Sequence, residues 1–199
     1  MSALAQRIAT YEDLLAVPEN LVAEIIGGVL YTLPRPAGRH GRAQSDLGVI
    51  LGGPFRLGRG GPGGWWFLDE PELHLLGDIV VPDLAGWRRD RLRSPGDHTH
   101  FSIAPDWVCE ILSPRTERID RLTKMDLYAR AGVGHAWLID PRQRTLEVYR
   151  LTPDGLWLRI GTWADAEQPH AEPFDAIALE LGELWDLTDL PDDPQTTGR

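Results

Sequence analysis

Two apolar segments each contain one carboxylate, and this pattern constrains the fold more than any other feature of the chain. The first segment is Val80-Val81-Pro82-Asp83, and the second runs from Trp107 to Leu112 and contains Glu110. Runs this apolar are typical of strands that are covered on both faces of a sheet, where charged side chains are rare. The sequence therefore predicts a buried sheet with an acidic residue in each of two strands.

Strand periodicity indicates where these two carboxylates point. Successive side chains of a strand face opposite sides of the sheet, so Glu110 shares a face with Val108 and Leu112. Asp83 shares a face with Val81 in the same way. If the two strands are neighbours, Asp83 and Glu110 lie side by side, where they repel each other unless a proton or a cation lies between them. Ligands that are all oxygen atoms favour Mg²⁺ or Mn²⁺.

Lys124 is the only lysine of the chain, since the other basic residues are all arginine. A compact ammonium on a flexible stem has uses that a planar guanidinium cannot reproduce. A helix capped by Ser113 or Thr116 is predicted to run to about Ala131, and on it Asp120 and Lys124 fall on one stripe that turns apolar further along. The two residues either form a surface ion pair, or the lysine lies at the edge of buried surface that faces the sheet.

The ordered set of these residues resembles a known nuclease family. A Pro-Asp pair, a following strand with a glutamate and a lysine on the next helix are similar to the motif of the PD-(D/E)XK nuclease superfamily, with a migrated lysine. The longer matching string is Pro82-Asp83, Pro105-Asp106-Trp107-Val108-Cys109-Glu110-Ile111-Leu112-Ser113-Pro114, Asp120, Lys124, Tyr128-Ala129, Gly132-Val133 and Trp137-Leu138-Ile139-Asp140-Pro141. This string resembles the Uma-two family of restriction-endonuclease-like proteins over residues 10 to 150.

The resemblance implies an α/β fold of the restriction-endonuclease-like type, with a mixed central sheet flanked by helices. It implies a metal-dependent endonuclease that hydrolyses DNA phosphodiester bonds, with Asp83, Glu110 and Lys124 as catalytic residues. Asp83 and Glu110 would hold Mg²⁺ or Mn²⁺, and Lys124 would replace the motif lysine, whose place is taken by Leu112. The resemblance leaves self-association open, with a homodimer as one option, since nucleases of this fold often pair to cut both strands. The alternative is a catalytically inactive nucleic-acid-binding or assembly module on the same fold.

Three further residues are auxiliary candidates for the same site. Glu24 lies in the first arm of a hairpin predicted around Gly27-Gly28. It is either an exposed strand carboxylate or, as the resemblance implies, a third acid near the metal. His40 begins a predicted helix that ends near Leu51, and it is either a solvated helix-end residue or a contact to a substrate phosphate. Asp120 is the third candidate, as the predicted partner of the lysine.

The net charge of −10 does not exclude a nucleic-acid substrate. Residues 164–193 contain ten acidic residues and no lysine or arginine, whereas the rest of the chain, Arg199 apart, holds 20 acidic and 19 basic residues. Two stretches are locally basic: Arg35, Arg39, Arg42, Arg56 and Arg59, and then Arg88, Arg89, Arg91 and Arg93. A local patch is enough to neutralise phosphates, although solvated loop charge is the favoured explanation for any one of these arginines.

We expect residues 1–187 to form one domain and residues 188–199 to be a disordered acidic tail. The single cysteine, Cys109, lies in the predicted core strand, so a disulfide framework is excluded. The chain has no apolar run long enough for a membrane span and no signal pattern at its N-terminus, so we expect a cytoplasmic protein. His98 and His100 have a spacing that could bind zinc, but no partner ligands are evident in the sequence.

The remaining segments are predicted mostly as strands. Residues 65–68 and 73–76 are expected to pair with each other and to lead into the Asp83 strand, and the glycine-rich residues 52–64 to form a flexible connector. Three strands, at residues 135–140, 145–151 and 156–163, are expected to follow the lysine helix, with one more short element within residues 177–185.

Overall fold

A six-stranded mixed sheet forms the centre of the computed structural model, which describes residues 7–34 and 38–185. The strand order is β10-β9-β8-β7-β6-β3. The strands are β3 (Trp65–Asp69), β6 (Leu84–Arg88), β7 (Trp107–Ile111), β8 (His135–Asp140), β9 (Thr145–Leu151) and β10 (Trp157–Ala164). Strands β7 and β8 are parallel and the other neighbours are antiparallel, so the predicted α/β fold with a mixed sheet is confirmed.

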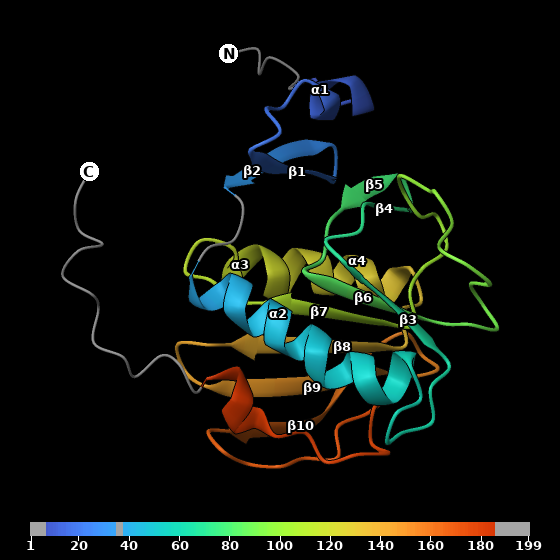
Figure 1. Ribbon diagram of the computed structural model, residues 1–199. Helices are drawn as coiled ribbons and strands as arrows, with labels where there is room; N and C mark the ends of the chain where they lie inside the picture. Colours follow the sequence, from blue (N-terminus) through green and yellow to red (C-terminus); the bar gives the residue numbers. More distant parts are fainter. Residues whose placement is uncertain (1–6, 35–37, 186–199) are drawn as a thin grey trace.

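Helices cover both faces of this sheet (Figure 1). On one face, α2 (Arg39–Leu51) continues into a π-helical turn, η1 (Gly52–Arg56). On the other face lie α3 (Glu117–Ile119), the π-helical turn η2 (Asp120–Lys124) and α4 (Met125–Arg130). Residues 52–56 are thus helical, and the prediction of a flexible connector was wrong for this part.

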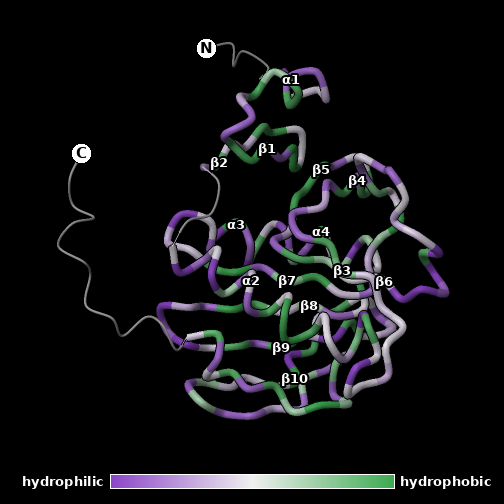
Figure 2. The backbone as a smooth tube through the Cα atoms, viewed as in Figure 1, coloured by the Kyte–Doolittle hydropathy of each residue, from purple (hydrophilic) through white to green (hydrophobic). Residues whose placement is uncertain are grey.

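The central strand β7 is buried on both faces, as its apolar sequence predicted. Trp107, Cys109 and Ile111 pack with α2, whereas Val108 and Leu112 pack with α4. Figure 2 shows this strand as largely hydrophobic, and Glu110 is its one charged residue. Each fully buried aliphatic or aromatic side chain contributes about 1.5 to 3 kcal/mol, so the layers on both faces hold the strand firmly in place.

The acidic C-terminal segment is part of the domain up to Trp185. Phe174 is fully buried, with ring centroids 5.1 Å from Trp107 and 5.5 Å from Trp137. The indole N–H of Trp137 donates to the carbonyl of Glu172 at 2.7 Å. The predicted short element is a 3-10 turn, η3 (Leu181–Leu184). The predicted acidic tail, residues 188–199, lies outside the described residues.

A second, four-stranded sheet with the order β2-β1-β5-β4 packs beside the first and was not predicted. Its strands are β1 (Leu21–Ile26), β2 (Val29–Pro34), β4 (Leu73–Leu75) and β5 (Asp78–Val80), and the short helix α1 (Tyr11–Leu15) precedes β1. The hairpin between β1 and β2 was predicted correctly. Gly27 and Gly28 have φ angles of 60° and 76°, which residues other than glycine rarely adopt.

The segment that contains Asp83 is not a single strand, contrary to the prediction. Strand β5 ends at Val80 in the second sheet, and β6 begins at Leu84 in the central sheet. Pro82 has no N–H to donate to a strand ladder, and the chain passes from one sheet to the other at this residue. Asp83 therefore lies between the two sheets, directly before β6.

The predicted pairing of residues 65–68 with residues 73–76 was also wrong. Strand β3 pairs with β6 at the edge of the central sheet, and β4 pairs with β5 in the second sheet. Two adjacent apolar runs can pair with each other or with later strands, and the sequence pattern does not distinguish these cases. None of the described helices combines the length and the apolar composition that crossing a bilayer requires.

Candidate active site

A cavity of about 390 Å³ lies where the two sheets meet η2. Its walls come from β1, β2, the start of α2, the crossing before β6, the end of β7 and the helix that follows. The lining residues are Val22, Glu24, Leu33, Pro34, His40, Glu70, Val81, Asp83, Glu110, Ser113, Arg115, Thr116, Asp120 and Lys124. All six predicted site residues are among them: Asp83, Glu110, Lys124, Glu24, His40 and Asp120.

The register of β6 and β7 brings Asp83 beside Glu110. Leu84 is opposite Cys109, so the preceding residue on one strand lies next to the following residue on the other. The backbone N–H of Ile111 donates to Asp83 Oδ2 at 2.6 Å, which continues the ladder through a side chain. The two carboxylates therefore lie side by side as expected, although Asp83 directly precedes β6 and is not part of a strand.

Lys124 is buried among three carboxylates and is not half of a surface ion pair. Its Nζ lies 2.9 Å from Glu24 Oε1, 3.4 Å from Glu110 Oε2 and 3.6 Å from Asp120 Oδ1. Only 5% of the side chain is exposed. Burial favours the neutral amine, but Glu110, Glu24 and Asp120 outweigh it and raise the pKa of Lys124 well above its usual value. The lysine is therefore a charged ammonium inside the site.

A π-helical turn presents Asp120 and Lys124 to the cavity. The turn spans these two residues, and the N–H of Met125 donates to the carbonyl of Asp120, five residues earlier. A π turn widens the helix by one residue and is frequent at functional sites. The sequence predicted the helix but not this local change, because nothing in a helical stripe distinguishes a π turn from an α turn.

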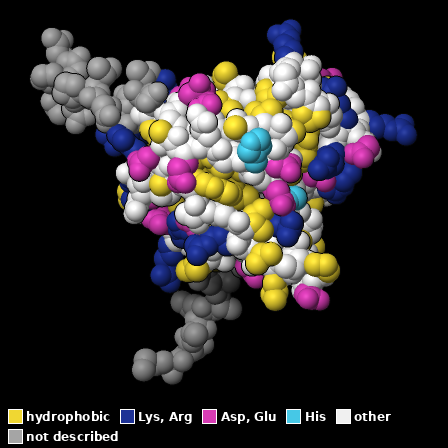
Figure 3. All heavy atoms as spheres, turned by 90° about the horizontal axis from the view of Figure 1, so that it is seen from below, with side chains coloured by type: hydrophobic (Ala, Val, Ile, Leu, Met, Phe, Trp, Pro, Cys, Tyr) yellow, Lys and Arg dark blue, Asp and Glu magenta, His cyan; other side chains and the backbone are white. Residues whose placement is uncertain are grey.

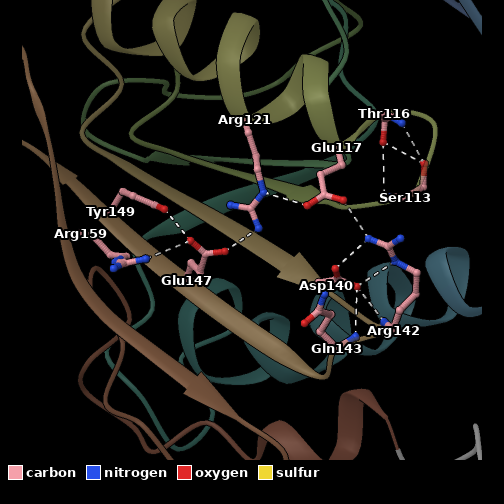
Figure 4. A network of polar contacts seen from close by, with 10 residues as sticks. All are labelled: Ser113, Thr116, Glu117, Arg121, Asp140, Arg142, Gln143, Glu147, Tyr149 and Arg159. Atoms are coloured by element: carbon pink, nitrogen blue, oxygen red, sulfur yellow. Dashed lines mark hydrogen bonds and ion pairs between the residues drawn. The ribbon is translucent and has the colours of Figure 1, made fainter.

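A polar network on the outer side of the same helix fixes its position on the sheet (Figure 4). Arg121 donates to Glu147 of β9 at 2.6 Å and to Glu117 at 3.1 Å. Arg142 donates to Glu117 at 3.0 Å and to Asp140 Oδ2 at 2.8 Å. Arg121 links the helix to β9, and Arg142 links it to the end of β8. These links hold the inner residues of the helix over the cavity.

Tyr128 is a site residue that the sequence analysis did not single out. Its hydroxyl donates to Glu110 Oε1 at 2.5 Å, and both side chains are buried. Burial raises the pKa of Glu110 well above its usual value, against the opposing charge of Lys124. Burial and then the charge of Glu110 raise the pKa of Tyr128 in turn. The available signal was spacing, since Tyr128 follows Lys124 by one helical turn.

Helix α2 anchors Asp83 through two residues. His40 Nε2 lies 3.3 Å from Asp83 Oδ1, and the side-chain amide of Gln44 donates to the Asp83 carbonyl at 2.8 Å. Burial lowers the pKa of His40, but Asp83 raises it further, so the net shift is upward. The helix-end histidine is therefore not a solvated residue, because it is largely buried against a site carboxylate.

Glu24 is the third acid of the cluster rather than an exposed strand residue. Only 1% of it is exposed, and its Oε1 accepts from the backbone N–H of Val81 at 2.7 Å. Its Oε2 is buried without a hydrogen-bond partner among the described residues. A buried carboxylate oxygen without a partner is costly, and a divalent cation would satisfy it. An oxygen-only donor set beside one ammonium fits a hard ion such as Mg²⁺ or Mn²⁺.

The charge cluster predicts how stability depends on pH in the absence of metal. Burial raises the pKa of Asp120 from 3.8 to about 6, although Lys124 opposes the shift. Between these values Asp120 therefore binds more protons in the folded state than in the unfolded state, and its contribution to stability falls as the pH rises through this window. Asp120→Asn should remove up to about 3 kcal/mol of this fall. Denaturant unfolding of wild type and Asp120→Asn in the presence of a chelator, from pH 4 to 7, measures the free energy of unfolding at each pH. If its dependence on pH is the same in both proteins, the titrating group is not Asp120.

A family model described as "Uma2: Putative restriction endonuclease" matches residues 8–182. The chain belongs to this family. A crystal structure described as a putative nuclease belonging to DUF820, from Anabaena variabilis ATCC 29413, superposes with a TM-score of 0.72. The two chains are 24% identical, over 89% of this chain and 98% of the other, and at that identity the likeness shows the fold alone. A search of curated proteins finds no match.

In this Uma2 chain Leu112, where the sequence resemblance expects a motif lysine, has an apolar role. Leu112 is 2% exposed and packs in the cluster beneath α4, while its N–H donates to the carbonyl of Ile139 at 2.7 Å. The Lys124 ammonium approaches Glu110 from the helix instead. This geometry supports the interpretation that the helix lysine supplies the charge that the strand lacks.

Proposed function

We propose that this Uma2 protein is a metal-dependent endonuclease that hydrolyses DNA phosphodiester bonds. The observation that carries the proposal is the buried cluster of Glu110, Glu24 and Asp120 around one ammonium, with Asp83 beside Glu110, at a cavity that is large enough to admit a phosphate group. A purely structural core rarely concentrates so many ionisable groups, and strongly shifted pKa values in a cleft are typical of active sites. Membership of the family supports nuclease function in general.

The residues divide into ligands, a charge donor and positioning groups. Asp83 and Glu110 would hold Mg²⁺ or Mn²⁺, with Glu24 Oε2 as an additional oxygen donor. Such an ion, when bound, polarises the phosphate and activates a water molecule. Lys124 would stabilise charge on the scissile phosphate or position the attacking water. Tyr128 holds Glu110 by its hydrogen bond, as His40 and Ile111 hold Asp83.

Arginine side chains near the cavity are candidates for contacts to the DNA backbone. Arg115 is exposed and lines the cavity, although the sequence analysis did not single it out. Several predicted contacts already have protein partners: Arg42 pairs with Asp46, Arg91 pairs with Asp106, and Arg89 stacks on a tryptophan ring at 4.2 Å. The basic stretches therefore serve partly to hold the fold, and Arg115 is the better-placed phosphate contact.

The face that carries β10 does not resemble a DNA-binding surface. Figure 3 shows acidic and basic side chains interspersed there with exposed hydrophobic ones. A phosphate backbone requires a local excess of positive charge, so we place DNA at the cavity instead. Self-association stays open, and the cytoplasmic location remains a prediction.

Mg²⁺ or Mn²⁺ is expected to raise the melting temperature, because the ion binds carboxylates that repel one another in the folded state. At a metal concentration of 100 times the dissociation constant, the gain is about 2.7 kcal/mol. The double variant Asp83→Asn, Glu110→Gln should lose this gain while remaining folded, since both amides fill the same space. Thermal denaturation with and without the ion is the measurement.

The variant Asp106→Asn is a matched control for that experiment. Asp106 is a carboxylate beside β7 that bonds to Arg91 outside the cavity, so its loss should leave the metal response intact. An undiminished response in the double variant would show that the ion binds elsewhere. The inactive binding-module alternative has no need of this metal response.

A further inference from the structure

A second cluster of metal-binding side chains lies on the outer side of β4, apart from the cavity. It consists of Glu72, His74 and His100, whose candidate ligand atoms all lie within 4.8 Å of one another. Glu72 and His74 flank Leu73 of β4, and His100 precedes Phe101 in the loop between β6 and β7. None of the three residues lines the cavity.

The backbone explains why these three side chains meet. Leu73 and Phe101 form an isolated parallel bridge, in which the N–H of His74 donates to the backbone carbonyl of Phe101 and the N–H of Phe101 donates to the backbone carbonyl of Glu72, both at 2.9 Å. Leu73 is 0% exposed and Phe101 is 8% exposed, so both point into the core. Side chains alternate along extended backbone, so Glu72, His74 and His100 point to the opposite side together.

The side chains are already close to a ligand arrangement. His74 Nε2 lies 2.7 Å from Glu72 Oε1, and the rings of His74 and His100 stack with centroids 4.1 Å apart. Ligand atoms around tetrahedral zinc are roughly 3.3 Å apart, given metal-ligand distances of about 2.0 Å. His100 is exposed, so its ring can rotate out of the stack and turn a nitrogen toward an ion held by Glu72 and His74 without disturbing the core.

Tyr11 of α1 supplies the outer partner that metal ligands commonly have. Its hydroxyl donates to Glu72 Oε1 at 3.0 Å, and its ring contacts the edge of His74 with centroids 5.3 Å apart. Such contacts fix the orientation of a ligand before the metal binds. The tyrosine therefore holds both Glu72 and His74 in place.

We propose that Glu72, His74 and His100 bind a transition-metal ion of the zinc class, which joins α1 and the second sheet to the loop between β6 and β7. Two imidazoles and one carboxylate favour Zn²⁺, Co²⁺ or Ni²⁺ over Mg²⁺, so this ion differs from that of the cavity. The sequence suggested a His98–His100 pair, but the ring of His98 packs against Phe101 and is not part of the cluster. The partners of His100 come from β4 instead.

Zinc titration of the full chain by calorimetry, in excess Mg²⁺, tests this site. We expect one Zn²⁺ per chain, with affinity reduced at least about a hundredfold by His100→Ala and about tenfold by Tyr11→Phe. His98→Ala is the matched control and should leave the affinity unchanged. The double variant Asp83→Asn, Glu110→Gln should still bind zinc, which separates this site from the cavity.

Several outcomes would overturn the proposal. If wild type binds no Zn²⁺, or if His100→Ala binds it as tightly as wild type, the two histidines only stack. If His98→Ala weakens binding as strongly as His100→Ala, the metal is bound by His98 and His100 of the loop rather than by the proposed cluster. If zinc binding is lost in the Asp83, Glu110 double variant, the ion belongs to the cavity.

Discussion

Lys124→Ala is expected to slow DNA cleavage by the equivalent of about 2 to 4 kcal/mol of transition-state stabilisation, a loss comparable to removing one oxyanion-hole donor. The reason is geometric: the Lys124 ammonium lies 3.4 Å from Glu110 Oε2, and Lys124 lines the same cavity as Asp83. Lys124→Arg should restore little activity, because a planar guanidinium is bulkier than the ammonium it replaces. Cleavage rates at saturating Mg²⁺, normalised to the folded fraction, measure the effect.

Stability must be measured in the same variants, because Lys124 also balances buried charge. Removing one partner of a buried ion pair costs about 3 to 5 kcal/mol, and here three carboxylates lose their ammonium. Lys124→Met keeps most of the volume and removes only the charge, so it should be as slow as the alanine variant. Arg130→Ala removes a basic residue from the exposed side of α4 and should leave the cleavage rate unchanged.

A wild-type rate in folded Lys124→Ala or Lys124→Met would contradict the assigned role. The lysine would then serve only to neutralise Glu24, Glu110 and Asp120 in the folded protein. A catalytic role for the site would then rest on Asp83 and Glu110 alone.

Much of the central sheet could be predicted from the sequence because its strands are buried on both faces. The apolar run from Trp107 to Leu112 indicated the central strand, and its single glutamate stood out for that reason. The site followed from the same pattern, since a carboxylate inside such a run needs a compensating group. Lys124 was identified because no other lysine competes with it.

The parts that could not be predicted depend on contacts between distant segments. The second sheet pairs β1 with β5, more than fifty residues apart, and no local pattern encodes that choice. The same limitation hid the contacts of His40 and Gln44 with Asp83 and that of Tyr128 with Glu110. For Glu24, alternation along β1 indicated which face of the strand the side chain occupies. It did not show that this face is buried at the cavity.

Asp83→Ala is expected to abolish cleavage, with a loss of about 4 kcal/mol or more, because it removes a proposed ligand of the catalytic ion. It also removes the acceptor of the Ile111 N–H and the partner of His40. Asp83→Asn is the sharper variant, since an amide oxygen can still accept from Ile111 while the charge is lost. Equal inactivity of the two variants would show that the charge, rather than the hydrogen bond, is required.

Plasmid nicking with Mg²⁺ or Mn²⁺, wild type beside Asp83→Ala, tests the central claim most directly. Wild type should convert supercoiled DNA to nicked or linear forms only when the divalent ion is present, and the variant should leave it supercoiled under the same conditions. An Asp83→Ala protein that cleaves as fast as wild type would contradict the account, as would a folded wild-type protein that binds the ion and never cleaves DNA.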